Sequence, residues 1–191
     1  MKNVAVLIGS LSGKSINRTL AKVLEKLGEG RLRFDYLDLG ALPFYNDDLW
    51  DNPPAAVLDM KQRIIDADAV LIVMPEYNRS FPALIKNALE WGSRPYGQNA
   101  WGDKPLAMAG ASPGAIGTAA GQSQLRATLP LYGLVVMGQP EVYLHFKPGL
   151  IDEHFEVTDE QSRGFLENFV DKFIEWIERH GQHHPVSVAA E

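Results

Sequence analysis

Short apolar runs without alternation recur along the chain, at residues 4–8, 69–74, 106–109 and 134–137, and turn or breaker residues bound each of them. Strands that are buried on both faces have this pattern. The half-polar segment LRFDYLDL, residues 32–39, predicts a fifth strand.

Segments with the apolar spacing of helices separate these strands, at residues 16–27, 55–65, 82–91 and 117–131, and a longer one follows at residues 159–179. Strands that alternate with helices predict a parallel sheet with helices on both faces, because right-handed crossovers place them there. The predicted fold class is α/β, a flavodoxin-like three-layer doubly wound fold with a five-stranded parallel sheet. We expect a single flavodoxin-like domain over residues 1–182 and a frayed, flexible tail at residues 183–191, where the sequence has no periodicity.

The composition excludes several classes of function. The chain has 191 residues, a formal net charge of −6 and no cysteine. A negative chain lacks the basic face of a nucleic-acid-binding protein, and without cysteine there is no disulfide, zinc-thiolate or thiol chemistry. No apolar run approaches the ~18 residues of a membrane span. We therefore expect a cytoplasmic protein, and any redox chemistry that it performs would require a bound cofactor.

Candidate chemistry lies in the loops that follow the buried strands, because ligands of doubly wound sheets bind beyond the carboxyl ends of the strands. After the first strand, GSLSGKSIN (residues 9–17) enters a helix with two glycines, three hydroxyls and an asparagine. Free amides at a helix N-terminus and short hydroxyl donors favour a phosphate. The plainer alternative is that Ser15 only caps the helix and the glycines only form the turn.

Two nucleotide-binding motifs do not match this loop. Its GKS resembles the end of a Walker A loop, but Ile8 stands where the first glycine is required. The third strand also runs into Pro75 and Glu76 rather than into an aspartate for magnesium. Because the Gly-x-Gly-x-x-Gly dinucleotide fingerprint is missing as well, a mononucleotide remains.

Two further loops have the features of a flavin-ring site. PEYNRSFP, residues 75–82, offers a proline-set backbone and a tyrosine against which a flat ring can lie. ASPGAIG, residues 111–117, adds Ser112 and two glycines that allow a close approach of backbone to ligand. A phosphate at the first loop and a ring at the other two predict FMN.

Four segments, GSLSGKSIN, LPFYNDDL (42–49), PEYNRSFPALIKNALEW (75–91) and SRPYGQNAWGDKP (93–105), together resemble the NAD(P)H-dependent FMN reductase family. The similarity is closest to its chromate reductase and quinone reductase branch and covers about residues 3–145. It implies a flavodoxin-like fold, non-covalent FMN and NADPH or NADH as co-substrate. It also implies a homodimer with each flavin near the partner subunit, in some members paired into a dimer-of-dimers tetramer.

The resemblance further implies the cofactor-binding residues. They are Ser10, Leu11, Ser12, Gly13, Lys14, Ser15, Ile16 and Asn17 in the phosphate loop, Pro75, Glu76, Tyr77 and Asn78 in the ring loop, and Ser112. Relatives often have arginine where this chain has Ser12, and Lys14 is expected to supply the missing charge as a point charge. Some relatives also have a subunit-joining arginine near Ala120, so its absence here favours the dimer over the tetramer.

The activity that the resemblance implies is hydride transfer from NAD(P)H via bound FMN to quinones and other electron-poor acceptors, such as chromate, azo or nitro compounds, by a ping-pong two-electron mechanism. Arg94 is the expected substrate-binding residue, with a plain surface arginine as the alternative. No catalytic side chain and no metal are expected, because flavin N5 carries the hydride. Two other functions stay open, a flavodoxin-type electron carrier and an FMN reductase that supplies free reduced flavin to a partner.

Overall fold

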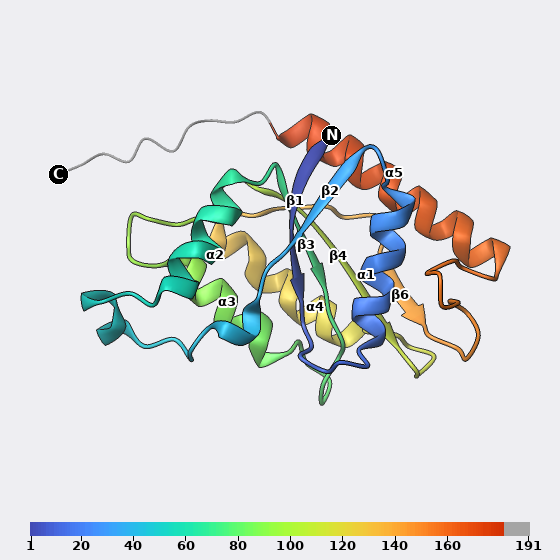
Figure 1. The fold of residues 1–191 in the computed structure, drawn as a ribbon, viewed down its shortest axis with the longest axis horizontal. Helices are drawn as coiled ribbons and strands as arrows, with labels where there is room; N and C mark the ends of the chain where they lie inside the picture. Colours follow the sequence, from blue (N-terminus) through green and yellow to red (C-terminus); the bar gives the residue numbers. More distant parts are fainter. Residues whose placement is uncertain (182–191) are drawn as a thin grey trace.

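A computed structural model describes residues 1–181, and the tail predicted at residues 183–191 lies outside the described residues. A parallel sheet runs through the centre of the molecule in the order β2-β1-β3-β4-β5 (Figure 1). The strands, in chain order, are β1 (Lys2–Ile8), β2 (Leu32–Tyr36), β3 (Ala69–Val73), β4 (Pro105–Ser112), β5 (Val135–Val136) and β6 (Val142–His145). This order and parallel pairing confirm the flavodoxin-like doubly wound fold.

The last position in the sheet is shared by two short strands. β5 pairs with Pro105 and Leu106 at the start of β4, whereas β6 pairs with residues 109–112 at its end. The strand predicted at 134–137 is therefore only two residues long, and the strand at 142–145 was not predicted. Pro140, which cannot donate to a ladder, lies between the two pieces. Pairing with β6 also extends β4 to Ser112, beyond the predicted end at residue 109.

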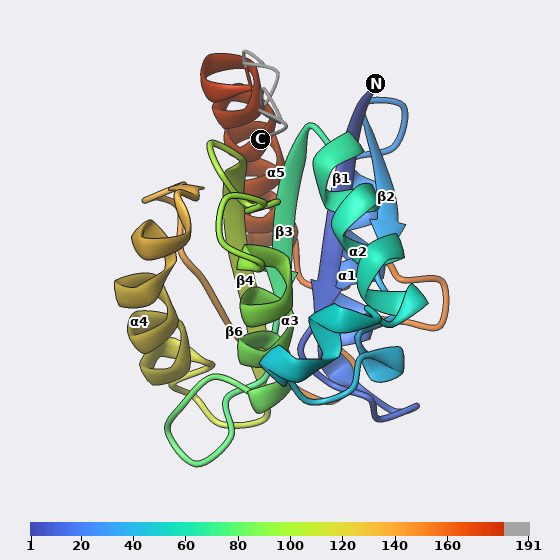
Figure 2. The same cartoon turned by 90° about the vertical axis from the view of Figure 1, so that its left-hand side faces the viewer.

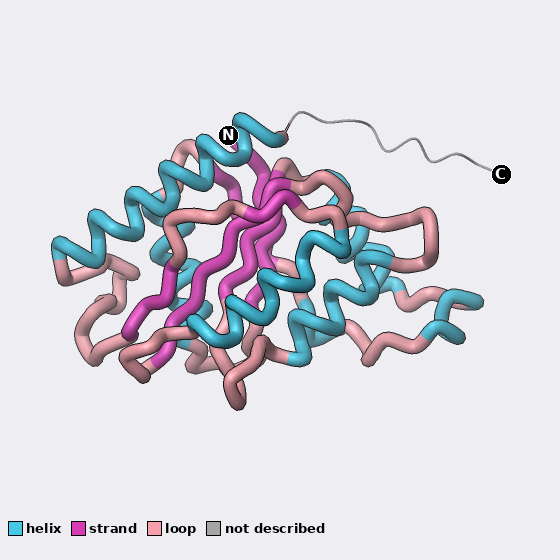
Figure 3. Tube along the Cα trace, turned by 180° about the vertical axis from the view of Figure 1, so that it is seen from behind, coloured by secondary structure: helices cyan, strands magenta, loops and turns pink. Residues whose placement is uncertain are grey.

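Helices cover both faces of this sheet, as Figures 2 and 3 show. Alternate residues of β1 point to opposite faces: Val4 and Val6 pack with α1 and α5, while Leu7 packs with α2 and α3. The α-helices are α1 (Ile16–Leu27), α2 (Ala55–Asp66), α3 (Ala83–Ser93), α4 (Ala119–Thr128) and α5 (Glu160–His180). Short 3₁₀ helices span Leu39–Ala41, Asp47–Asp51 and Leu129–Tyr132.

Four of the five α-helices begin and end within two residues of the predicted bounds, and α4 is the exception. The predicted helix at 117–131 is an α-helix only from Ala119 to Thr128. Gly117 has a left-handed backbone with φ of 67°, which a right-handed helix excludes. Pro130 lacks the amide that an α-helix would use, and the chain tightens there into a 3₁₀ turn. Within residues 1–181, no helix combines the length and apolar character that crossing a membrane requires.

Candidate flavin-binding site

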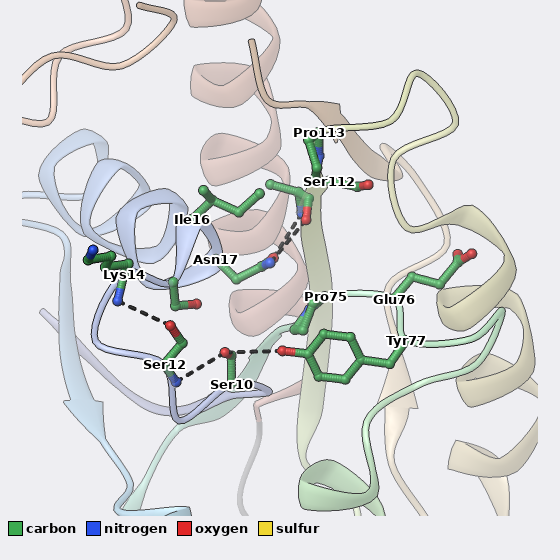
Figure 4. A pocket seen from close by; sticks show the side chains of 12 residues that line it. Ser10, Ser12, Lys14, Ile16, Asn17, Pro75, Glu76, Tyr77, Ser112 and Pro113 are labelled. Atoms are coloured by element: carbon green, nitrogen blue, oxygen red, sulfur yellow. Dashed lines mark hydrogen bonds between the residues drawn. The ribbon is translucent and has the colours of Figure 1, made fainter. Parts of the chain in front are cut away.

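A pocket of about 240 Å³ lies beyond the carboxyl ends of β1, β3 and β4 (Figure 4). Three loops line it, and they are the three that sequence reasoning selected. The lining residues are Ser10, Ser12, Lys14, Ser15, Ile16 and Asn17 after β1, Pro75, Glu76 and Tyr77 after β3, and Ala111, Ser112 and Pro113 at the end of β4.

The ends of β1 and β3 meet closely at Gly9. Its amide donates to the carbonyl of Val73 at 2.9 Å. A Cβ on Gly9 would lie 2.7 Å from Cβ of Met74 and 3.2 Å from Cδ of Pro75. Since real Cβ atoms are essentially never found as close as 2.7 Å, glycine is required for the loop after β1 to start this close to the loop after β3.

The first loop, residues 10–15, is a series of turns closed by serine side chains. Oγ of Ser10 accepts from the amide of Ser12 at 3.3 Å, and Oγ of Ser12 accepts from the amide of Lys14 at 3.2 Å. Ser15 is the N-cap of α1, where its Oγ accepts from the amide of Arg18. The capping role of Ser15 is therefore real, and it does not exclude a ligand, because the residue also lines the pocket.

The N-terminus of α1 offers donors to this pocket. Within residues 1–181, no hydrogen bond occupies the backbone amides of Ile16 and Asn17. First-turn amides point out of a helix at the positive end of its dipole. With the exposed ammonium-bearing side chain of Lys14 beside them, they are donors of the kind that a phosphate group requires.

Asn17 lines the pocket, but its side chain is already used. Its Nδ2 donates to the carbonyl of Ala111 at 3.0 Å, and its Oδ1 accepts from the amide of Ala111 at 2.8 Å. Figure 4 shows the two bonds crossing from α1 to the end of β4. The side chain is 1% exposed. Sequence reasoning placed Asn17 among phosphate ligands, whereas in this structure only its backbone amide is free for that purpose.

The second loop forms one wall. Tyr77 and Ser80 exchange two backbone hydrogen bonds of 3.0 Å, which close a tight turn with Asn78 and Arg79 at its tip in left-handed conformations. The ring of Tyr77 extends toward the first loop, and its hydroxyl donates to Oγ of Ser10 at 3.3 Å (Figure 4). This arrangement leaves the tyrosine half exposed at the pocket wall.

Glu76 has a partner that the sequence did not reveal. Its Oε2 accepts from the amide of Gly121, in the first turn of α4, at 2.9 Å. A carboxylate at a helix N-terminus is stabilised by the helix dipole. Glu76 therefore links the second loop to α4 through its side chain, rather than serving as an isolated carboxylate.

The third loop, residues 111–114, forms the remaining wall. Oγ of Ser112 accepts from the amide of Gly114 at 3.1 Å, and its carbonyl accepts from the amide of Phe146 at 2.8 Å. Ala111 and Pro113 also line the pocket. These two were not among the predicted site residues, because an alanine and a proline have no polar group to single them out.

Four predicted site residues are not among those that line the pocket. Leu11 is 66% exposed and lies over Gly40, and Gly13 is exposed in the turn. Asn78 is at the tip of its turn, exposed to solvent. Arg94 ends α3 at its far end, eleven helical residues from the loop that contains Tyr77. The structure does not bring Arg94 to the pocket of its own chain.

The side chain of Lys61 forms hydrogen bonds to the backbone of the segment that contains Arg94. Its Nζ donates to the backbone carbonyls of Gly92, Arg94 and Gln98, with 2.7 Å to the last. Burial lowers the pKa of Lys61 to about 8, so the ammonium is still protonated at neutral pH. A cation at the C-terminus of α3 complements the negative end of the helix dipole.

Comparison with known proteins decides the family. The model of the NADPH-dependent FMN reductase family matches residues 2–149, more than half of the chain. The chain belongs to this family. The match includes all three loops of the pocket, so the residues that line it lie within the part of the chain that the family model covers.

Relatives of the family cover almost the whole chain. A 2-hydroxy-1,4-benzoquinone reductase from Burkholderia sp is 45% identical over 91% of this chain and 95% of its own. A quinone reductase from Pseudomonas putida is 42% identical over 92% and 94%. The structure of FerB, a flavoenzyme NAD(P)H:(acceptor) oxidoreductase from Paracoccus denitrificans, is similar with a TM-score of 0.93 and 51% identity, covering 94% of this chain and 99% of that one.

Proposed function

We propose that the protein is an FMN-dependent oxidoreductase that transfers hydride from NAD(P)H, via bound FMN, to quinones and other electron-poor acceptors. The observation that carries this proposal is the pocket itself: unpaired helix amides on one side and a tyrosine wall on the other, in a chain of the FMN reductase family. Relatives named for quinone reduction and for NAD(P)H oxidation support the substrate class.

The residues present fit FMN. The amides of Ile16 and Asn17, with Ser12 and Lys14 beside them, would hold the phosphate. The isoalloxazine ring would lie between the wall formed by Tyr77 and the loop at residues 111–113. When bound, FMN supplies two-electron hydride chemistry that no side chain provides.

The contribution of the chain is to hold and orient, and no side chain is assigned as an acid or base. The pocket, about 240 Å³, is smaller than the ~300–1,000 Å³ that enclose a drug-sized ligand. A bound mononucleotide would leave part of its ring at the open mouth. An open ring face suits a ping-pong enzyme, because NAD(P)H and the acceptor use it in turn. Chromate, azo and nitro compounds are acceptors of the same electron-poor kind.

The role of Arg94 depends on assembly. Because it lies away from the pocket of its own chain, a substrate-binding role requires a homodimer in which it approaches the flavin of the partner subunit. We include that homodimer, and a cytoplasmic location, in the proposal. If Arg94 serves the partner, it would attract anionic acceptors or the phosphates of NADPH as a permanent cation.

The visible absorption spectrum of the purified protein tests the function. Flavin bands that bleach directly to the two-electron reduced form on anaerobic addition of NADPH, and return with benzoquinone, are the expected result. Bands that NADPH cannot bleach would favour the flavodoxin-type electron carrier. Flavin that separates from the protein on gel filtration would favour a reductase that supplies free reduced flavin. A colourless protein that does not bind added FMN would refute the proposal.

A further inference from the structure

The side chain of Asn17 makes hydrogen bonds to β4 that the backbone of a neighbouring strand would otherwise make. In a parallel ladder a residue's amide and carbonyl face the same neighbouring strand, and successive residues face opposite neighbours. Ala109 of β4 faces β3, since its carbonyl accepts from the amide of Met74 at 3.1 Å. Ala111, two residues on, faces the same side, where β3 has already ended at Val73.

The backbone after β3 does not supply the missing pairing. Met74 makes the last bond of the β3–β4 ladder, to Ala109, and within residues 1–181 no backbone hydrogen bond joins Ala111 to residues 74–76. The amide and carbonyl of Ala111 are buried, and leaving them without partners would be costly. The carboxamide of Asn17 supplies one donor and one acceptor at the required positions, so it completes the ladder where β3 leaves it.

We propose, resting on the FMN-binding function above, that the side chain of Asn17 is a positioning residue for the flavin ring and not a ligand of its phosphate. The two hydrogen bonds from Asn17 to Ala111 fix the spacing between the first turn of α1, which offers amides to the phosphate, and Ser112, which lines the ring side. Without these two hydrogen bonds, the ring wall and the phosphate site are no longer held at a fixed distance. Their loss therefore weakens the binding of any flavin, with or without a phosphate.

Affinities for FMN and riboflavin, which differ only in the phosphate, test this role. They are measured by titration of flavin-free wild type, Asn17→Asp and Asn17→Ala. Asn17→Asp keeps the shape but turns a carboxylate oxygen toward the carbonyl of Ala111. Asn17→Ala should weaken the binding of FMN and of riboflavin by the same factor, about tenfold or more, the change that 1.4 kcal/mol produces. Asn17→Asp should weaken the binding of both flavins as well, and that of FMN further, because its negative charge lies beside the phosphate site. Lys14→Ala is the comparison, since loss of this cation should weaken FMN more than riboflavin.

Each other outcome has a definite meaning. Loss of FMN affinity with riboflavin affinity unchanged would make Asn17 a phosphate ligand and overturn the proposal. A lower melting temperature with both affinities unchanged would make it only structural, and would also overturn it. Wild-type protein that binds neither flavin would refute the proposed function, and the positioning role with it.

A measurement on the wild-type protein tests the same proposal if the variants fail to fold. Hydrogen exchange of the Ala111 amide reports the bond to Oδ1 of Asn17 directly. Slow exchange in both the FMN-free and the FMN-bound protein is expected. Fast exchange in the FMN-bound protein would mean that Asn17 leaves Ala111 for the phosphate, and fast exchange in the FMN-free protein would mean that the bond does not persist; either result overturns the proposal.

Discussion

The close approach of β1 and β3 at Gly9 makes a quantitative prediction about Gly9→Ala. The added methyl group would lie 2.7 Å from Cβ of Met74 and 3.1 Å from its Cα. Relaxed contacts between carbon atoms are about 3.5–4.0 Å, so the two strand ends must separate by about 1 Å. Neither contact is the flexible end of a side chain that can rotate away.

This displacement should affect both stability and binding. Overpacking of this kind costs about 1–3 kcal/mol of unfolding free energy, which lowers the melting temperature of a chain this size by about 2–12 °C. Gly9 begins the phosphate loop and Pro75 begins the ring loop. Their separation changes the spacing of the FMN site, and we expect FMN to bind about tenfold or more weakly.

Urea unfolding and FMN titration of the purified variant measure both effects. Gly138→Ala is the matched control, because a Cβ on Gly138 meets nothing within 4 Å and the residue is exposed. Its stability should stay within about 0.5 kcal/mol of the wild type. A Gly9→Ala protein that is as stable as this control and binds FMN as the wild type does would refute the packing argument.

Three further predictions concern contacts around the site. Glu76→Ala removes the acceptor for the amide of Gly121 and should lower the free energy of unfolding in urea by about 1–2 kcal/mol, whereas Glu76→Gln keeps an acceptor and should lose less than half of that; equal losses would contradict the hydrogen bond. Gly92→Ala places a Cβ 2.3 Å from the buried indole of Trp101 and should lower the melting temperature more than Gly9→Ala does, measured by circular dichroism; a smaller loss would contradict the packing. Because burial lowers the pKa of Lys61 from 10.5 to about 8 in the folded protein, the unfolded chain binds more protons between these values and stability rises with pH there. Wild type should therefore gain up to about 2 kcal/mol over Lys61→Met between about pH 7 and about pH 9.5 in urea unfolding, and a pH-independent difference would contradict the shift.

The sequence was sufficient for the strands whose residues are apolar on both faces. The run at 69–74 predicts β3 almost to the residue, because every side chain of this strand is buried. It was insufficient at the edge of the sheet, where β6 alternates between buried and half-buried residues over only four positions. A strand that short has too few positions to establish a period, and only its pairing with β4 identifies it.

The pocket shows the same division. Its three loops could be located from the ends of the predicted strands, because topology alone places those ends together. The role of the Asn17 side chain could not be predicted, because its partner, Ala111, is 94 positions away in the sequence. An asparagine in a phosphate loop has the same local signature whether it binds a ligand or a distant backbone group. The distance of Arg94 from the pocket of its own chain could not be predicted either, since it depends on the length of α3 and not on the chemistry of the residue.

The three loops are connected to one another by side chains, and this has a consequence for cofactor binding. One side-chain hydrogen bond joins the second loop to the first, from Tyr77 to Ser10, and another joins it to α4, from Gly121 to Glu76. The side chain of Asn17 joins α1, which follows the first loop, to Ala111 at the start of the third. A triangle of such links fixes the distance between the phosphate site and the ring walls before any ligand arrives. Binding to a preorganised site loses less conformational entropy than binding to mobile loops. The proposed FMN site therefore depends on the fixed geometry of its walls as well as on its contacts to the phosphate, where this chain has Ser12 and Lys14.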